Sequence, residues 1–285
     1  MATDPDDPAG AATLQDEGDG GGRPTISKLV ITADDYGCRP AYDEGILTAA
    51  RVGAVDSVSA FALRSALGPE PLLETGVEIG LHLELGAEGD SARADATERA
   101  AAAAAIAEQY GAFAQRFRQP PAYLDGHRHG HARDGLGIVL SDFAVAHDLP
   151  VRSIGERHRR MLRCRGVPTP DLLIGRTHES EPPLPAELGA GADAIAALPP
   201  VVEWMTHPGR RDPEARSRYD RGREVDLELL LGWQAPESLQ RSTHRAALSP
   251  AGAVCAVESW ATVAASSSSE ASRSSAKESN PAIVS

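Results

Sequence analysis

Residues 29–37 have the sequence Leu-Val-Ile-Thr-Ala-Asp-Asp-Tyr-Gly, in which an apolar run leads into two adjacent carboxylates, Asp34 and Asp35. A short apolar run of this kind is typical of a strand that is buried in a parallel sheet. Pro40 follows and suits the first turn of a helix, where a backbone N–H has no helical partner in any case. The stretch therefore predicts a buried strand, a loop that carries the acidic pair, and a helix from Pro40 to about Gly53.

Strand and helix patterns continue to alternate along the chain. We expect strands at 55–63, 77–85, 123–124, 151–154, 172–174 and 201–205, and helices at 93–117, 135–147 and 212–231. Alternating strands and helices are joined by right-handed crossovers into a parallel sheet. Polar residues follow several of the strands, whereas no GxGxxG or GxxxxGK(S/T) motif does. The fold class that we predict is α/β, a distorted or incomplete parallel β/α barrel in a single domain.

Composition divides the chain into three parts. Residues 1–26 are acidic and Gly-rich, with few apolar side chains to offset the entropy cost of ordering. Residues 241–285 are rich in Ser and Ala, which is typical of a low-complexity tail. We therefore expect a disordered N-terminal segment, a folded body at 27–240 and a flexible tail at 241–285.

Charge and cysteine usage restrict the partners and the compartment. The 285 residues include 41 Asp and Glu against 28 Lys and Arg, a net charge of −13, so we expect no nucleic acid partner. No apolar run is long enough to span a membrane, and residues 1–26 lack the pattern of a secretory signal. Cys38, Cys164 and Cys255 have no paired spacing, which indicates free thiols in a reducing compartment. We expect a cytoplasmic protein that contacts no membrane.

The segment 125–131, Asp-Gly-His-Arg-His-Gly-His, is the most informative for chemistry. In an extended chain Asp125, His127, His129 and His131 would line one side of a strand end. Imidazole binds Zn, Fe, Ni and Cu well, and Mg or Mn when carboxylates share the site. The segment is therefore either a metal-binding strand end or a solvated His-rich loop.

Several further polar residues follow or interrupt predicted strands. His82 faces away from the leucines of 77–85, either as a hydrogen-bonded buried histidine or as a metal ligand. Asp34 and Asp35 repel each other unless a cation or proton lies between them, although Asp is also common in turns and helix caps. His207 precedes Pro208-Gly209, a turn that would hold it rigidly at the rim of the sheet. Glu203, on the same strand, either orients another group or is solvated.

Four short motifs that occur in order resemble one known family. They are Thr32–Gly37, Gly80–Leu83, Tyr123–His131 and Thr206–Gly209, and a helix signature at Tyr219–Glu224 follows them. Together they resemble the YdjC/ChbG-type carbohydrate deacetylases, a family that includes the hopanoid-associated HpnK branch. The resemblance covers about 27–235, and the stretch after Leu85 is shorter than the loop that is usual in the family.

The resemblance implies an incomplete β/α barrel that removes an acetyl group from an N-acetylated sugar by amide hydrolysis. It implies a divalent metal, Mg²⁺ first, with Zn²⁺ or Mn²⁺ as alternatives. The residues to which it assigns roles are the metal ligands Asp35, His82 and His127, the general base Asp34, the acid His207, and the supporting residues His129 and His131. In the amide hydrolysis that we envisage, Arg152 is a candidate donor to the developing oxyanion.

Two other functions stay open from the sequence. Other barrel metallo-hydrolases, of the amidohydrolase or phosphoesterase kind, also place a His-x-His pair at a strand end. A degenerate member that binds sugar or metal without turnover would keep the same residues. The partner that we expect is a small N-acetylated sugar, and a homodimer is an open alternative to the monomer.

Overall fold

The computed structural model describes residues 27–64, 66–86, 93–215 and 217–248. Its strands are β1 (Ser27–Tyr36), β2 (Ser57–Ala60), β3 (Glu78–Leu83), β4 (Leu124–Gly126), β5 (Leu172–Ile174), β6 (Val201–Thr206) and β7 (Leu239–Arg241). All pairings are parallel, in the order β4-β3-β2-β1-β6-β5, and β7 pairs with the first residues of β1. The central position of β1 follows from its sequence, since all but one of its residues are buried.

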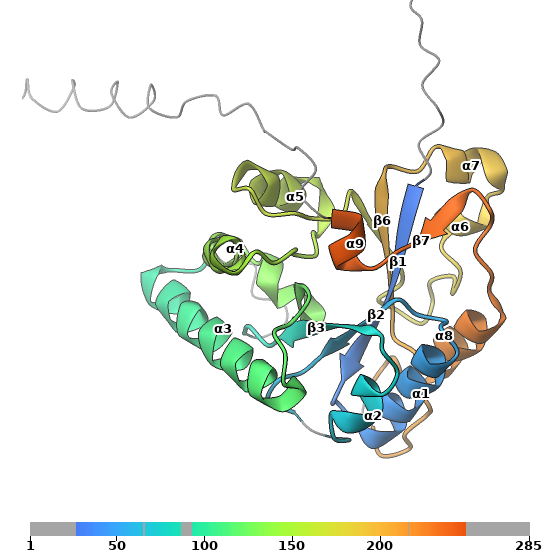
Figure 1. Ribbon diagram of the computed structural model, residues 1–285, viewed down its shortest axis with the longest axis horizontal. Helices are drawn as coiled ribbons and strands as arrows, with labels where there is room; N and C mark the ends of the chain where they lie inside the picture. The colour runs from blue at the N-terminus through green and yellow to red at the C-terminus, as the bar shows by residue number, and fades with distance from the viewer. Residues whose placement is uncertain (1–26, 65, 87–92, 216, 249–285) are drawn as a thin grey trace, which may run out of the picture.

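Helices flank this curled sheet (Figure 1). They are α1 (Pro40–Arg51), α2 (Glu70–Leu73), α3 (Ala96–Phe117), α4 (Leu136–His147), α5 (Gly155–Cys164), α6 (Ala186–Gly189), α7 (Ala192–Ala196), α8 (Asp220–Gly232) and α9 (His244–Leu248), with a 3₁₀ helix η1 at His127–Ala132. In Figure 1, α3, α4 and α5 lie on one side of the strands, and α1 and α8 lie together on the other. The architecture is a single α/β domain, an incomplete β/α barrel, as the sequence predicted.

Local signals place several helix ends well. Pro40 is the first residue of α1, as expected. At the start of α3, the Asp95 carboxylate accepts from the Glu98 backbone N–H, and the Glu98 side chain accepts from the Asp95 N–H. This capping box satisfies two N–H groups that a helix start leaves open. The Ala-rich sequence that follows favours a helix, and α3 ends at Phe117. The helix predicted at 93–117 is therefore confirmed.

Three predicted boundaries are wrong. The acidic pair lies inside the end of β1 and not in a loop after it, because β1 continues to Tyr36. The segment 151–154 makes only an isolated bridge from Val151 to Leu124, because α5 begins at Gly155. The helix expected from residue 212 begins at Asp220, because the preceding loop is held against α1 by the Arg210 N–H, which donates to the Ala41 carbonyl at 2.9 Å.

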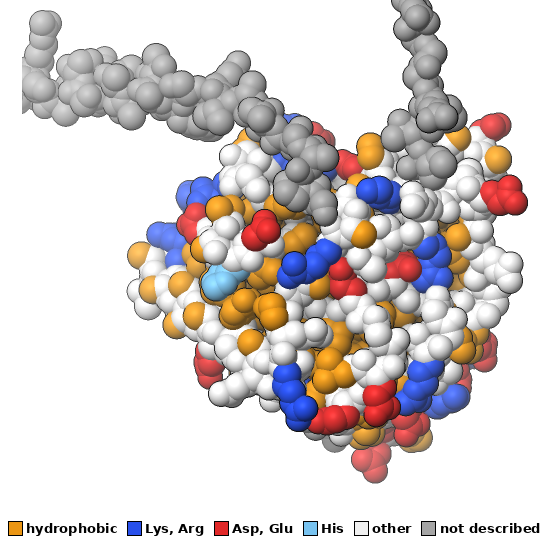
Figure 2. All heavy atoms as spheres, viewed as in Figure 1, with side chains coloured by type: hydrophobic (Ala, Val, Ile, Leu, Met, Phe, Trp, Pro, Cys, Tyr) orange, Lys and Arg blue, Asp and Glu red, His pale blue; other side chains and the backbone are white. Residues whose placement is uncertain are grey.

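The folded body also continues past residue 240, where we expected the tail to begin. β7 ends at Arg241 and α9 covers His244–Leu248, with the His244 side chain fully buried. The segment 1–26 and the rest of the expected tail lie outside the described residues. Figure 2 shows acidic and basic side chains interspersed over one face of the molecule. Within the described ranges, no helix is long and apolar enough to cross a membrane.

Candidate functional site

Asp35, His82 and His127 meet at one point, although they come from β1, β3 and the start of η1. Asp35 Oδ1 lies 3.2 Å from His82 Nε2 and 3.0 Å from His127 Nδ1, and the two ring nitrogens are 3.4 Å apart. One ligand atom from each residue therefore lies within 4.8 Å of the other two. The three positions that the sequence analysis named as metal ligands are thus brought together.

The His82 ring is oriented from behind by a carboxylate. Its Nδ1 lies 2.8 Å from Asp125 Oδ1, while Nε2 faces Asp35. A histidine that ligates a metal commonly donates its other ring N–H to a carboxylate, which fixes the ring and its tautomer. Ser59 donates to the second oxygen of Asp125 at 2.5 Å, so Asp125 is itself held in place.

These contacts test whether the three residues fit a divalent cation. The donor set is one carboxylate and two imidazoles, which is a common set for divalent metals in proteins. Asp35 and His82 are almost fully buried, and His127 is partly exposed, so the donors are rigid on one side and accessible on the other. The residues fit such a cation.

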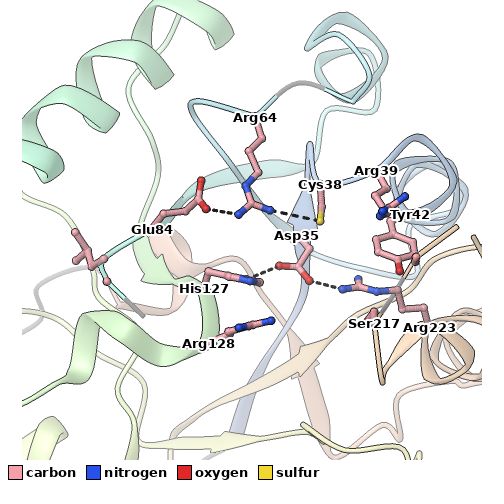
Figure 3. Close-up of a pocket in the computed structure, with 13 residues that line it drawn as sticks. Asp35, Cys38, Arg39, Tyr42, Arg64, Glu84, His127, Arg128, Ser217 and Arg223 are labelled. Atoms are coloured by element: carbon pink, nitrogen blue, oxygen red, sulfur yellow. Dashed lines mark hydrogen bonds and ion pairs between the residues drawn. The ribbon is translucent and has the colours of Figure 1, made fainter. Parts of the chain in front are cut away.

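Arg223 holds the second oxygen of Asp35, and the sequence analysis did not single this residue out. Its Nη2 bonds to Asp35 Oδ2, and its guanidinium lies 4.0 Å over the Tyr42 ring (Figure 3). Burial alone would raise the pKa of Asp35, but Arg223 and then the histidines lower it well below its usual value. Asp35 is therefore an anion whose Oδ1 is directed towards His82 and His127. The helix signature around Tyr219–Glu224 was the sequence signal that contained Arg223.

Arg152 is fully buried and is surrounded by three carboxylates. Its Nη1 and Nη2 donate to the two oxygens of Asp34 at 2.6 and 2.8 Å, and its Nε donates to Glu203 at 2.8 Å. Nη2 also lies 2.9 Å from Asp125. Burial alone would raise the pKa of Asp34, but the charge and hydrogen bonds of Arg152 oppose this effect, and the pKa is lowered. The donors of Arg152 are thus directed to these carboxylates and not to the pocket, which corrects our expectation that it would face an oxyanion.

A pocket of about 390 Å³ opens over this site. It is lined by Asp35 and His127 on one side and by Arg64, Glu84 and Arg223 around them (Figure 3). The pocket gives a small molecule direct access to two of the three candidate ligands. Most of the loop after Leu85, whose shortness we noted, lies outside the described residues.

The expected alternation of side chains ends at Gly126. Arg128 and His129 have φ values of 51° and 59°, and η1 replaces the extended strand end that we predicted. Gly126 leaves no room for a side chain, since a Cβ there would lie 2.7 Å from His131 Nδ1. As a result His127 faces Asp35, whereas the His131 Nε2–H donates to the Arg152 carbonyl at 3.1 Å. His129 is partly buried near them, and burial lowers its pKa to about 4.

His131 also packs against His158 of α5, with ring centroids 5.5 Å apart. Burial, and then the nearby His129, lower the pKa of His158 to about 4. The folded protein thus keeps His158 neutral, whereas the unfolded chain binds a proton near pH 6.5. We expect this stabilisation to be complete above pH 6.5 and to be lost as the pH falls towards 4, by about 3 kcal/mol for this group.

Urea unfolding between pH 7 and 4 measures this loss. Asn replaces the ring acceptor Nδ1, which takes the Ile154 N–H at 3.1 Å, with an amide oxygen that does not titrate. The free energy of unfolding of His158→Asn should therefore fall less steeply with acid than that of the wild type. Equal slopes for the two proteins would show that His158 is protonated in the folded state as readily as in the unfolded chain.

His207 follows β6 and is fixed by its backbone. Its N–H donates to Asp226 Oδ2 at 3.0 Å, and the same oxygen accepts from the Tyr219 hydroxyl at 2.9 Å. Burial lowers the pKa of His207, while Asp35 and Asp34 oppose that effect. Gly209 completes the turn after His207. A Cβ added to Gly45 of α1 would lie 2.4 Å from the Cα of Gly209, so α1 packs directly on this turn. Asp226 is a second residue that the sequence analysis did not identify.

Known proteins resemble this chain in sequence and in fold. The model of the YdjC-like protein family matches residues 28–241. The chitooligosaccharide deacetylase of Proteus mirabilis (strain HI4320) is 27% identical over 233 residues, covering 71% of this chain and 89% of that protein. The carbohydrate deacetylase of Mus musculus is 31% identical over 168 residues, which are 49% of this chain and 52% of the mouse protein.

The chain therefore spans about half the length of the mouse relative. Among solved structures, protein EF3048 of Enterococcus faecalis V583 superposes with a TM-score of 0.64 at 21% identity, over 77% of this chain and 98% of that one. This likeness supports the fold. Because the family model covers β1 to β7 and all the residues of the candidate site, the chain belongs to the YdjC-like family.

Proposed function

We propose that this protein is a metal-dependent carbohydrate deacetylase, which hydrolyses an N-acetyl group on an amino sugar. The observation that carries the proposal is the convergence of Asp35, His82 and His127 beneath an open pocket, with Asp34 next to them in β1. Relatives named carbohydrate deacetylase and chitooligosaccharide deacetylase support the substrate class.

The donor set bears on which cation the site would hold. Mg²⁺ prefers oxygen ligands and keeps several waters, whereas imidazole nitrogens suit first-row ions such as Zn²⁺. Two of the three candidate ligands are imidazoles. We therefore place Zn²⁺ ahead of Mn²⁺ and of the Mg²⁺ that the family resemblance implies.

The chain's own residues supply the proton transfers. A bound divalent cation would lower the pKa of water and polarise the acetyl carbonyl. In this proposal Asp34, which Arg152 keeps ionised, accepts a proton from the attacking water. In this proposal a protonated His207 gives a proton to the leaving nitrogen, because an amide anion is too basic to depart. The carbonyl carbon gains the water oxygen, the C–N bond breaks, and acetate and a free amine are released.

Acetate release from a panel of N-acetylated mono- and oligosaccharides tests this function. We expect release that stops when the metal is removed by a chelator and that returns with Zn²⁺ more fully than with Mn²⁺ or Mg²⁺. Phosphate release from generic esters without acetate release would favour the phosphoesterase alternative. Sugar binding without any release would favour a non-catalytic protein.

A further inference from the structure

His244 lies in α9, beyond the last residue that the family model matches. Its ring is completely buried in the interior of the curled sheet. Glu78 of β3 accepts the backbone N–H groups of His244 and Arg245 at 2.7 and 3.2 Å, so the start of α9 is fixed to the sheet. A buried imidazole at this place needs partners inside the barrel.

One edge of the His244 ring points to the charges that hold Asp34. Its Nε2 lies 3.5 Å from Glu203 Oε1 and 3.1 Å from Thr32 Oγ1. The pKa of Glu203 is lowered, so this carboxylate is an anion that faces the polar edge of the His244 ring. The same Glu203 oxygen accepts from Arg152 Nε and lies 2.7 Å from Arg152 Nη2. His244 and Arg152 therefore both face one carboxylate oxygen, Arg152 by a hydrogen bond and His244 at 3.5 Å.

The face of the ring makes a second contact with the site's support. It stacks on Tyr123, with centroids 3.8 Å apart and an interplanar angle of 22°. The Tyr123 hydroxyl lies 2.9 Å from Ser59 Oγ, which donates to Asp125. Asp125 in turn orients His82. Two separate contacts of one ring thus lead to the residues that hold Asp34 and His82.

We propose that His244 is a positioning residue of the deacetylase site, acting through Glu203 on Arg152 and so on the orientation of Asp34. The inference rests on the proposed function for its effect on turnover. Glu203 is fully buried, and its Oε2 has no hydrogen-bond partner among the described residues. The orientation of Glu203 therefore depends on the groups that face Oε1, which are Arg152 and His244. Removal of His244 leaves Arg152 alone of these two.

Three substitutions separate the two contacts of the ring. His244→Ala removes both contacts. His244→Gln keeps a side-chain N–H donor near the position of Nε2 but loses the stacked face, whereas His244→Phe keeps the face and loses the donor. His178→Ala is the matched control, because His178 is exposed on a surface loop and bonds to Ser180.

The measurements are kcat and KM for acetate release, the metal content, and the exchange of the Arg152 Nε–H with water in ¹⁵N-arginine-labelled protein. We expect His244→Ala and His244→Phe to lower kcat by about 10- to 100-fold, because small displacements of a reacting group cost about that much. KM and metal content should stay within about threefold, and the Arg152 Nε–H should exchange at least about tenfold faster. His244→Gln should restore most of the kcat and most of the slow exchange of the Arg152 Nε–H. His178→Ala should match the wild type in every measurement.

Unchanged exchange of the Arg152 Nε–H in His244→Ala would overturn the inference, whatever the activity. The inference would also fail if His244→Phe had wild-type kcat and exchange while His244→Gln behaved like His244→Ala. In that case the stacked face of the ring, and not its polar edge, would support the site. If the wild type releases no acetate, the proposed function fails, and the exchange measurement still decides whether His244 positions Arg152. The Arg152→Lys variant identifies the resonance, because lysine has no guanidinium.

Discussion

An Arg152→Ala variant is expected to lose about 3–5 kcal/mol of the free energy of unfolding. The reason is the charge that this substitution leaves behind. Arg152 donates to Asp34 and Glu203 and lies within 2.9 Å of Asp125, and all of these groups are buried. Without the guanidinium, three carboxylates would lie in the interior of the sheet with one cation fewer, a state that is relieved by protonation or by unfolding.

Urea unfolding at pH 7 measures this loss. Arg165→Ala provides the control, since Arg165 pairs with Asp142 at the surface, and the loss of such a pair costs at most about 1 kcal/mol. If Arg152→Ala does not fold, Arg152→Lys keeps the charge and loses the paired hydrogen bonds to Asp34, so it should show an intermediate loss. A loss of less than 1 kcal/mol for Arg152→Ala would mean that the carboxylates are not jointly ionised around it.

The second large effect is expected for Asp34→Asn, which should lower kcat by about 10²–10⁴-fold and leave the metal content unchanged. Asn has nearly the same shape as Asp but cannot take a proton from water at neutral pH. Asp34 lies outside the Asp35, His82 and His127 set and belongs to a second cluster with His82 and Asp125. Both of its oxygens are bonded to Arg152, so we expect the metal ligands to remain. Acetate release and elemental analysis of the same preparations separate the two roles.

Two further variants make this comparison decisive. His82→Ala should lose both metal and activity, because it removes a ligand that Asp125 holds in place. Asp142→Asn makes the same chemical change on an exposed carboxylate and should behave as the wild type. Full activity in Asp34→Asn would exclude Asp34 as the base, and equal metal loss in Asp34→Asn and His82→Ala would make Asp34 a ligand instead.

The motifs named in the sequence account for most of the candidate site. Asp35, His82 and His127 follow or interrupt predicted strands, and the parallel sheet that the alternating pattern implies places such residues at one edge. Their convergence was therefore predictable without coordinates. The orientation of the His-rich segment was not, because the turn at Arg128 and His129 needs positive φ values at two consecutive residues, and only a few per cent of non-glycine residues adopt such values.

The sequence by itself determined the α/β class, most of the strands and helices, and the three residues that meet at the candidate metal site, because periodicity and strand-end motifs are local features. Only the tertiary structure decided the partners of those residues. Arg223 reaches Asp35 from 188 positions away, Arg152 is enclosed by three carboxylates from three strands, and His244 enters the interior from a segment with a tail-like composition. The physical reason is that a buried charge is stable only beside its counter-charge, and which one it meets depends on the order of strands in the sheet.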